Sequence, residues 1–135
     1  MNTKEVLISG LLGGLVVLII QQVAYYLVKM IWPYDILALA GMRAVTDPIM
    51  MLFFVYPWVL AFCVSIAYQH IKTAFTSCKN KPMCFGFLLW LIIGLPSAFL
   101  VWSSMDYPIS FTINSLFGSL IYLIALAYVI VKFSK

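Results

Sequence analysis

Hydrophobic residues in this chain form long blocks instead of recurring at every second, third or fourth position. Four segments contain no charged side chain, namely residues 6–28, 48–68, 83–102 and 109–131. A helix rises about 1.5 Å per residue, so about 20 residues cross a hydrocarbon core of about 30 Å. Strands of a membrane barrel would alternate apolar and polar positions, which these blocks do not. The pattern predicts an all-α, polytopic membrane protein whose residues 1–135 form one domain of four transmembrane helices.

Composition supports lipid as the solvent of this chain. Hydrophobic residues make up 65% and charged residues 9%, whereas soluble domains average about 45–50% and about 25%. The first apolar segment follows Lys4 as in a secretory signal, but it is longer than the roughly 7–15 residues of a signal core. We therefore expect it to stay in the protein as a helix.

Prolines mark the predicted helix boundaries. Three of them begin helices, with Asp47 as a capping side chain before the first: Pro48, Pro82 and Pro108. Two more, Pro57 and Pro96, lie inside the second and third segments. Each removes a backbone hydrogen bond, so kinks are predicted there.

The distribution of basic residues predicts the orientation. With four crossings, both termini and the 69–82 connection share one side, which carries Lys4, Lys72, Lys79, Lys81, Lys132 and Lys135. The other side carries Lys29 and Arg43. Six basic residues against two predict a multi-pass protein of the inner (cytoplasmic) membrane with both termini in the cytoplasm. The positive charge then serves contact with membrane lipids, and no nucleic acid partner is expected.

Aromatic residues near the segment ends suggest belts at the two membrane surfaces. Those at the inner ends are Tyr68, Phe85, Tyr128 and Phe133, and those at the outer ends are Trp32, Tyr34, Trp102 and Tyr107.

The 29–47 connection is long enough for a short interfacial helix. On such a helix Arg43 reaches Asp47 at a separation of four residues. One interpretation is a surface helix with a weak ion pair. The other is a candidate outer-surface site formed by Asp35, Arg43, Asp47 and Asp106.

Small residues recur at helix-packing intervals. The first segment has Ser9, Gly10, Gly13 and Gly14, and the fourth has Ser115, Gly118 and Ser119. Gly10 and Gly14 form one GxxxG motif, which lets two helix backbones approach closely in lipid. The motif predicts packing either within this chain or against another copy.

Polar residues inside the segments concentrate in the predicted outer half. They define a candidate pocket of Gln21, Gln22, Tyr25, Ser97, Thr112 and Asn114, which Tyr26 and Asp106 extend toward the surface. Polar groups within a membrane usually face the bundle interior or a watery cavity. The alternative is that the amides only hydrogen-bond neighbouring helices.

No motif for catalysis or a cofactor appears in the sequence. Cys78 and Cys84 lie near His70, but their spacing matches no standard zinc signature and supplies no fourth ligand, so no metal is predicted. The acidic residues lie outside the four segments, which disfavours proton-coupled transport. Enzyme activity is the least favoured class.

The second half resembles a known family. The run from Phe85 to Pro96, Phe-Gly-Phe-Leu-Leu-Trp-Leu-Ile-Ile-Gly-Leu-Pro, followed by Trp102-Ser-Ser-Met-Asp-Tyr-Pro, is similar to the second half of a family of small uncharacterised four-helix membrane proteins of bacteria and archaea. The resemblance covers about fifty residues. It implies the four-helix fold and adds no catalytic residue.

Two functions follow as hypotheses. The leading one is an accessory bundle that associates with itself or with other membrane proteins, because small bundles usually fill their own centres. The alternative is binding or transport of a small uncharged or amphipathic molecule through an outward-facing polar pocket.

Overall fold

The computed structural model describes residues 2–33, 35, 38–39, 41–44 and 46–134. Its elements, in chain order, are α1 (Thr3–Ile31), the 3₁₀ helix η2 (Pro48–Phe54), α2 (Tyr56–Ile71), the 3₁₀ turn η3 (Lys72–Phe75), α3 (Lys81–Leu89), the π-helical turn η4 (Trp90–Gly94), α4 (Leu95–Ser104) and α5 (Ile109–Phe133). These elements are all helical, which confirms the predicted all-α class.

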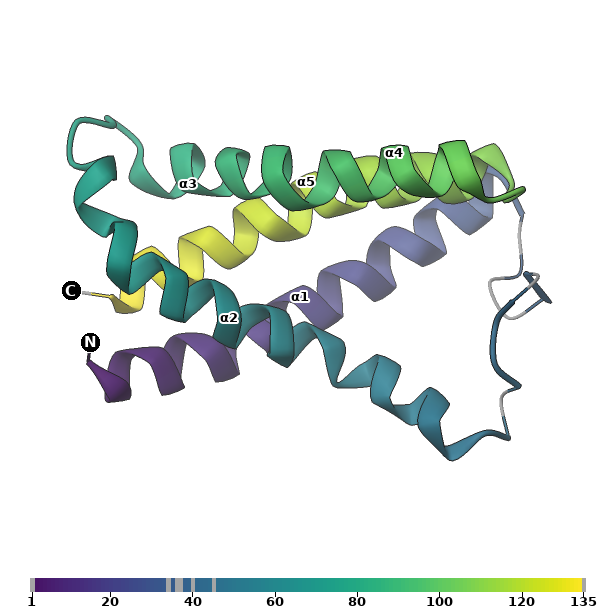
Figure 1. Cartoon of the computed structure of the whole chain (residues 1–135), viewed down its shortest axis with the longest axis horizontal. Helices are drawn as coiled ribbons and strands as arrows, with labels where there is room; N and C mark the ends of the chain where they lie inside the picture. Colours follow the sequence, from purple (N-terminus) through teal and green to yellow (C-terminus); the bar gives the residue numbers. More distant parts are fainter. Residues whose placement is uncertain (1, 34, 36–37, 40, 45, 135) are drawn as a thin grey trace.

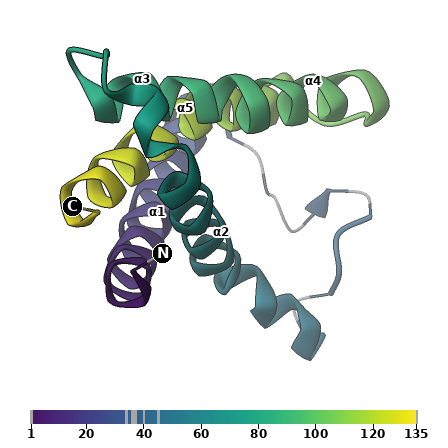
Figure 2. The ribbon, with the colours of Figure 1, turned by 60° about the vertical axis from the view of Figure 1, so that its left-hand side comes forward.

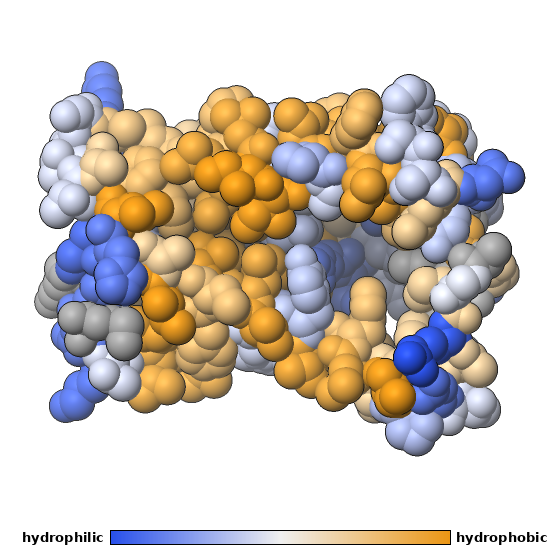
Figure 3. Space-filling model, viewed as in Figure 1, coloured by the Kyte–Doolittle hydropathy of each residue, from blue (hydrophilic) through white to orange (hydrophobic). Residues whose placement is uncertain are grey.

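Three helices are long and apolar enough to cross a membrane, namely Thr3–Ile31, the continuous Lys81–Ser104 and Ile109–Phe133. A fourth crossing is present if the bent pair Pro48–Phe54 and Tyr56–Phe75 is one span. Side chains on their outer surfaces are largely apolar and exposed (Figure 3). The structure is therefore compatible with insertion in a membrane.

The helices run between two ends of the molecule (Figure 1). We call the end that carries both termini and the η3 turn the terminal end, and the opposite end, where α1 stops and α5 begins, the loop end. Helix α5 packs against both α1 and α3, and α2 packs against α1. The arrangement brings the predicted polar residues of α1 and α5 to the same half of the molecule.

The second predicted span differs from a simple α-helix. Asp47 caps its start, because its side chain accepts a hydrogen bond from the Ile49 N–H at 2.9 Å. Residues Pro48–Phe54 form a 3₁₀ helix, and the chain bends by 45° before α2 continues toward the terminal end. Pro57 occupies the first turn of α2, so the predicted kink lies at this break.

The third span carries its irregularity differently. Asn80 caps α3 by accepting from the Met83 N–H at 3.4 Å, and Pro82 lies in the first turn, as predicted. Upstream of Pro96 the helix widens into the π turn Trp90–Gly94, where the Leu95 N–H bonds to the Trp90 carbonyl. A π turn contains one more residue than an α-helical turn. The span nevertheless continues through it as one helix from Lys81 to Ser104 (Figure 1).

The connection between α1 and η2 contains isolated turns among its described residues, including hydrogen bonds from Ala38 to Asp35 and from Asp47 to Ala44. The predicted interfacial helix is not confirmed. Positions 36–37, 40 and 45 of that prediction, and the predicted belt residue 34, lie outside the described residues.

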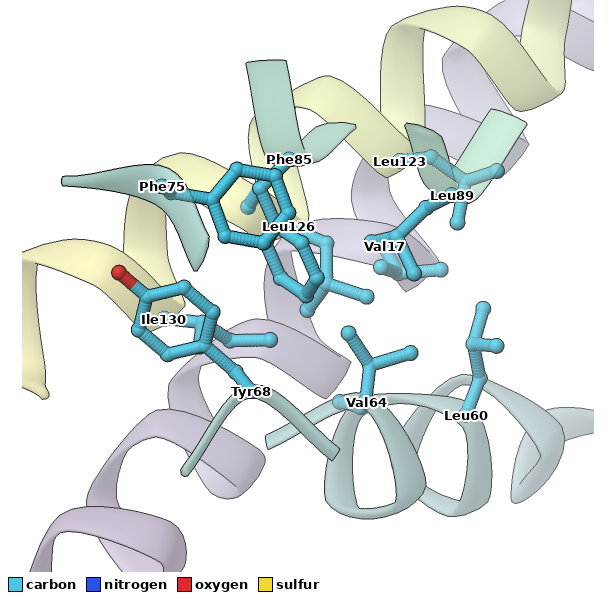
Figure 4. Packing of buried hydrophobic residues seen from close by; sticks show 12 residues of the cluster. Val17, Leu60, Val64, Tyr68, Phe75, Phe85, Leu89, Leu123, Leu126 and Ile130 are labelled. Carbon is cyan, nitrogen blue, oxygen red and sulfur yellow. The ribbon is translucent and has the colours of Figure 1, made fainter. Parts of the chain in front are cut away.

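The core occupies the terminal half, where α2, α3 and α5 converge (Figure 4). The rings of Tyr68, Phe75 and Phe85 pack together there, with Tyr68 and Phe85 centroids 4.7 Å apart. Tyr68 and Phe85 are 3% and 0% exposed, so their predicted place in an interfacial belt is wrong. Both side chains instead belong to the buried core of the bundle.

Helix α1 meets α2 at its small residues. A Cβ at Gly14 would lie 2.9 Å from the Trp58 Cα, and one at Gly10 would overlap the Phe62 ring. The hydroxyls of Ser9 and Ser65 share a buried hydrogen bond of 3.0 Å across the same crossing. Gly10 and Gly14 therefore face α2 of their own chain.

Candidate ligand-binding cavity

A cavity of about 730 Å³ opens in the loop half of the molecule. Its described lining comes from α1, η2, α5 and the α1–η2 connection, and consists of Gln21, Gln22, Ala24, Tyr25, Tyr26, Lys29, Asp35, Met42, Met50, Met51, Phe53, Phe54, Phe111, Asn114, Ser115, Gly118 and Tyr122. Figure 3 shows a recess on the side of the molecule, with hydrophilic side chains inside it. This volume lies within the range of about 300–1,000 Å³ typical of small-molecule sites.

The cavity exists because the second span diverges from its neighbours. On the terminal side of the 45° bend, α2 packs on α1. On the loop side of the bend, η2 points away from α1 and α5 (Figure 2). None of the residues of η2 is buried. The wedge between η2 and the α1–α5 pair is the cavity.

Amide and hydroxyl groups form the deep side. Tyr122 on α5 lies beside Gln21 on α1 and Tyr56 at the start of α2. Gln21 and Tyr122 both line the cavity, and so does Asn114, two turns closer to the loop end on α5. Gln21 and Tyr122, which we call the inner polar group, give the cavity hydrogen-bonding capacity near the middle of the span.

Methionine and phenylalanine side chains form the opposite wall. Met50, Met51, Phe53 and Phe54 come from η2, and Met42 comes from the connection before it. Methionine is flexible and polarisable, so such a wall adapts to apolar bodies of different shape.

Two charged residues mark the outer edge of the described lining. Lys29 lies near the end of α1 with its Nζ 5.6 Å from the centre of the Tyr25 ring, and Asp35 follows in the connection. One positive and one negative side chain leave this lining without net charge.

The predicted pocket is assembled in part. Gln21, Gln22, Tyr25 and Asn114 line the cavity, but Thr112 and Ser97 do not. Ser97 is exposed on α4 and donates to the Gly94 carbonyl at 3.0 Å.

Tyr122 and the wall residues of η2 were not predicted from the sequence. Tyr122 lies deep in an apolar run, and its spacing of eight from Asn114 places the two on one helix face. That periodicity is the signal that could have found Tyr122. The wall residues are ordinary apolar residues of the second segment and carry no such signal.

The predicted outer-surface site is not assembled among the described residues. Arg43 and Asp47 form an ion pair of 2.8 Å, and this pair together with the Ile49 N–H holds the pKa of the Asp47 carboxyl below its ordinary value. Asp35 instead lines the cavity, and Asp106 lies in the turn between α4 and α5, outside the cavity lining.

Small residues of α5 have different surroundings. Ser115 and Gly118 line the cavity, and a Cβ at Gly118 would meet only ordinary contacts, at 3.5 Å from the Asn114 Oδ1 and 3.7 Å from the Ala24 Cβ. Ser119 is buried and donates to the Leu116 carbonyl at 2.9 Å. It lies beside Gly94 of the π turn, where an added Cβ would come within 2.7 Å of the Ser119 Oγ.

The cysteines lie at the terminal half, away from the cavity. A hydrogen bond with Cys84, followed by burial, raises the pKa of the Cys78 thiol. Over the described part of the chain, His, Cys, Asp and Glu residues form no group of three that could hold a metal ion.

Comparison with protein-family models, with curated proteins and with solved structures finds no match for this chain. The resemblance of the second half to a four-helix family stays a prediction. The geometry of the cavity is therefore the main evidence for function.

Proposed function

We propose that this protein binds a small uncharged or amphipathic molecule in the loop-half cavity and takes it from the surrounding membrane. In this proposal the bent pair η2–α2 is one span, the chain crosses the inner membrane four times, and both termini lie in the cytoplasm. The cavity then lies in the outer half of the bilayer, as the lysines at the terminal end favour.

The position of the opening carries the proposal. The recess opens on a face of the molecule that runs along the helices, between their two ends (Figure 3). The side chains around it on that face are mostly apolar. A side opening at this depth meets lipid instead of water. A molecule that enters there must partition into the membrane, and the inner polar group then distinguishes it from a plain acyl chain.

The accessory-bundle hypothesis receives less support from the same structure. The GxxxG pair could have served association with another copy, but α2 already occupies both positions, through Phe62 at Gly10 and Trp58 at Gly14. This motif is therefore not available to a second copy in this conformation.

Photolabelling in lipid nanodiscs tests the proposal. The probe is a neutral fatty alcohol that carries a diazirine, and peptide mass spectrometry locates the attached label. We expect saturable labelling on η2 and on the cavity faces of α1 and α5, suppressed by an excess of unlabelled 1-decanol. Labelling of the lipid-facing side of α4 should rise linearly with probe concentration.

A matched pair of leucine variants on α5 provides the control. Gly118→Leu places a side chain in the cavity and should remove the saturable labelling. Ile121→Leu changes a residue that is 56% exposed and does not line the cavity, so its labelling should match that of the wild type. Equal labelling of all cavity and lipid-facing positions in the wild type would overturn the proposal.

A further inference from the structure

The cavity has hydrogen-bonding groups at two levels, near the middle of the span and again at its loop end, and an apolar wall on the η2 side faces them. From this arrangement, and resting on the proposed binding function, we infer that its ligand carries a neutral hydrogen-bonding group at each end and an apolar middle. Such a molecule differs from an ordinary lipid, whose deep end is a hydrocarbon chain.

The inner level lies far below the membrane surface. Gln21 is seven residues before the charge-free segment ends at residue 28, or about 10 Å along the helix axis. That depth is about a third of a hydrocarbon core of about 30 Å. An acyl chain reaching this level would meet the Gln21 amide and the Tyr122 hydroxyl, and it would cover them without giving a hydrogen bond.

The outer level is formed by Lys29 and Asp35. Gln22, Tyr25 and Lys29 follow one another at intervals of three and four, so they share the cavity face of α1. Lys29 can donate to an oxygen of the ligand, and its Nζ lies 5.6 Å from the centre of the Tyr25 ring. One cation and one carboxylate together favour an end group without net charge.

The middle level is apolar on the η2 side. Met50, Met51, Phe53 and Phe54 face the cavity from there, with Phe111 of α5. Gln21 and Lys29 are eight residues apart, or about 12 Å along the axis. The two ends of the ligand should therefore lie about 12 Å apart.

Competition between two matched alcohols tests the inference. In nanodiscs, 1,10-decanediol and 1-decanol are compared as competitors of the diazirine probe at equal concentrations in the lipid phase. Both have the same carbon chain, and only the diol has a second hydroxyl. We expect the diol to displace the probe at a concentration at least tenfold lower, which is about 1.4 kcal/mol.

Tyr122→Phe removes one hydroxyl of the inner polar group and keeps the ring. This variant should lower the diol-to-alcohol ratio at least threefold while leaving displacement by 1-decanol unchanged. Tyr128→Phe is the matched control, because Tyr128 lies near the terminal end and bonds to Asn80 instead of lining the cavity. Its ratio should equal that of the wild type.

The outcomes separate this inference from the binding function. Displacement by both alcohols at equal concentration would overturn the two-ended ligand and leave the cavity as a binding site. A ratio that Tyr122→Phe and Tyr128→Phe lower equally would also overturn it. Failure of both alcohols to suppress labelling in the cavity would overturn the binding function itself.

Discussion

Gly14→Ala should separate α1 from α2 and destabilise the protein. The added Cβ would lie 2.6 Å from the Trp58 Cγ and 2.9 Å from the Trp58 Cα. Rotation of the tryptophan can relieve the first contact, but the second involves the backbone of α2. The two helices must therefore move apart, and the contacts around the crossing weaken.

The magnitude follows from a comparison with Gly118→Ala. Overpacking at a tight contact costs about 1–3 kcal/mol, while replacing glycine by alanine in a helix gains up to about 1 kcal/mol. At Gly118 the added Cβ meets neighbours at 3.5 and 3.7 Å, so only the gain applies. The gain cancels between the two variants, and Gly14→Ala should be less stable than Gly118→Ala by about 1–3 kcal/mol.

Reversible unfolding in mixed micelles of a mild detergent and dodecyl sulfate measures the difference. The two variants are compared in the same lipid-free preparation, so that a cavity ligand does not contribute. Equal free energies of unfolding would contradict this prediction, because they would mean that α2 does not approach α1 as closely as the structure shows.

Three further predictions test local features. Asn80→Ala removes the α3 cap and should reduce the free energy of unfolding by about 0.5–2 kcal/mol, whereas Asn2→Ala should have little effect because Asn2 makes no side-chain cap to α1. The Asp47 pKa is lowered in the folded state, so its contribution to stability is present above its unfolded pKa of about 3.9 and is lost as pH falls through the folded value. Arg43→Gln should raise that pKa, and an unchanged carboxyl NMR titration would contradict the ion pair. Cys84→Ala should lower the raised pKa of Cys78, which moves the pH–rate profile of iodoacetamide labelling at Cys78 to lower pH; an unmoved profile would argue against the thiol contact.

Local chemistry determined several features that sequence reasoning could reach. Asn80 and Pro82 specify the start of α3, and α5 begins directly after Pro108. A cap and a fixed proline φ act within one helical turn, so no distant contact is needed. The apolar segments likewise predict helices long enough for a membrane, because backbone groups in lipid must bond within their own segment.

Which face each polar residue presents depended on packing. Ser97 was predicted to face the pocket, but the π turn over Trp90–Gly94 lies before it and α4 presents Ser97 on an exposed surface. One extra residue in a turn rotates every position that follows it. A hydropathy profile does not reveal this rotation, because the turn contains no charged residue that would mark it.

Hydropathy alone predicts that this chain is helical, that it suits a membrane, and that its polar amides lie in one half. Whether a cavity exists there depends on how the helices pack. The 45° bend before α2 turns η2 away from α1 and α5, and Tyr122 lines the same cavity as Gln21 from about a hundred residues away in the chain. How far η2 diverges from α1 and α5 depends on the side chains that pack where α2 crosses α1. Those contacts form only in the folded bundle.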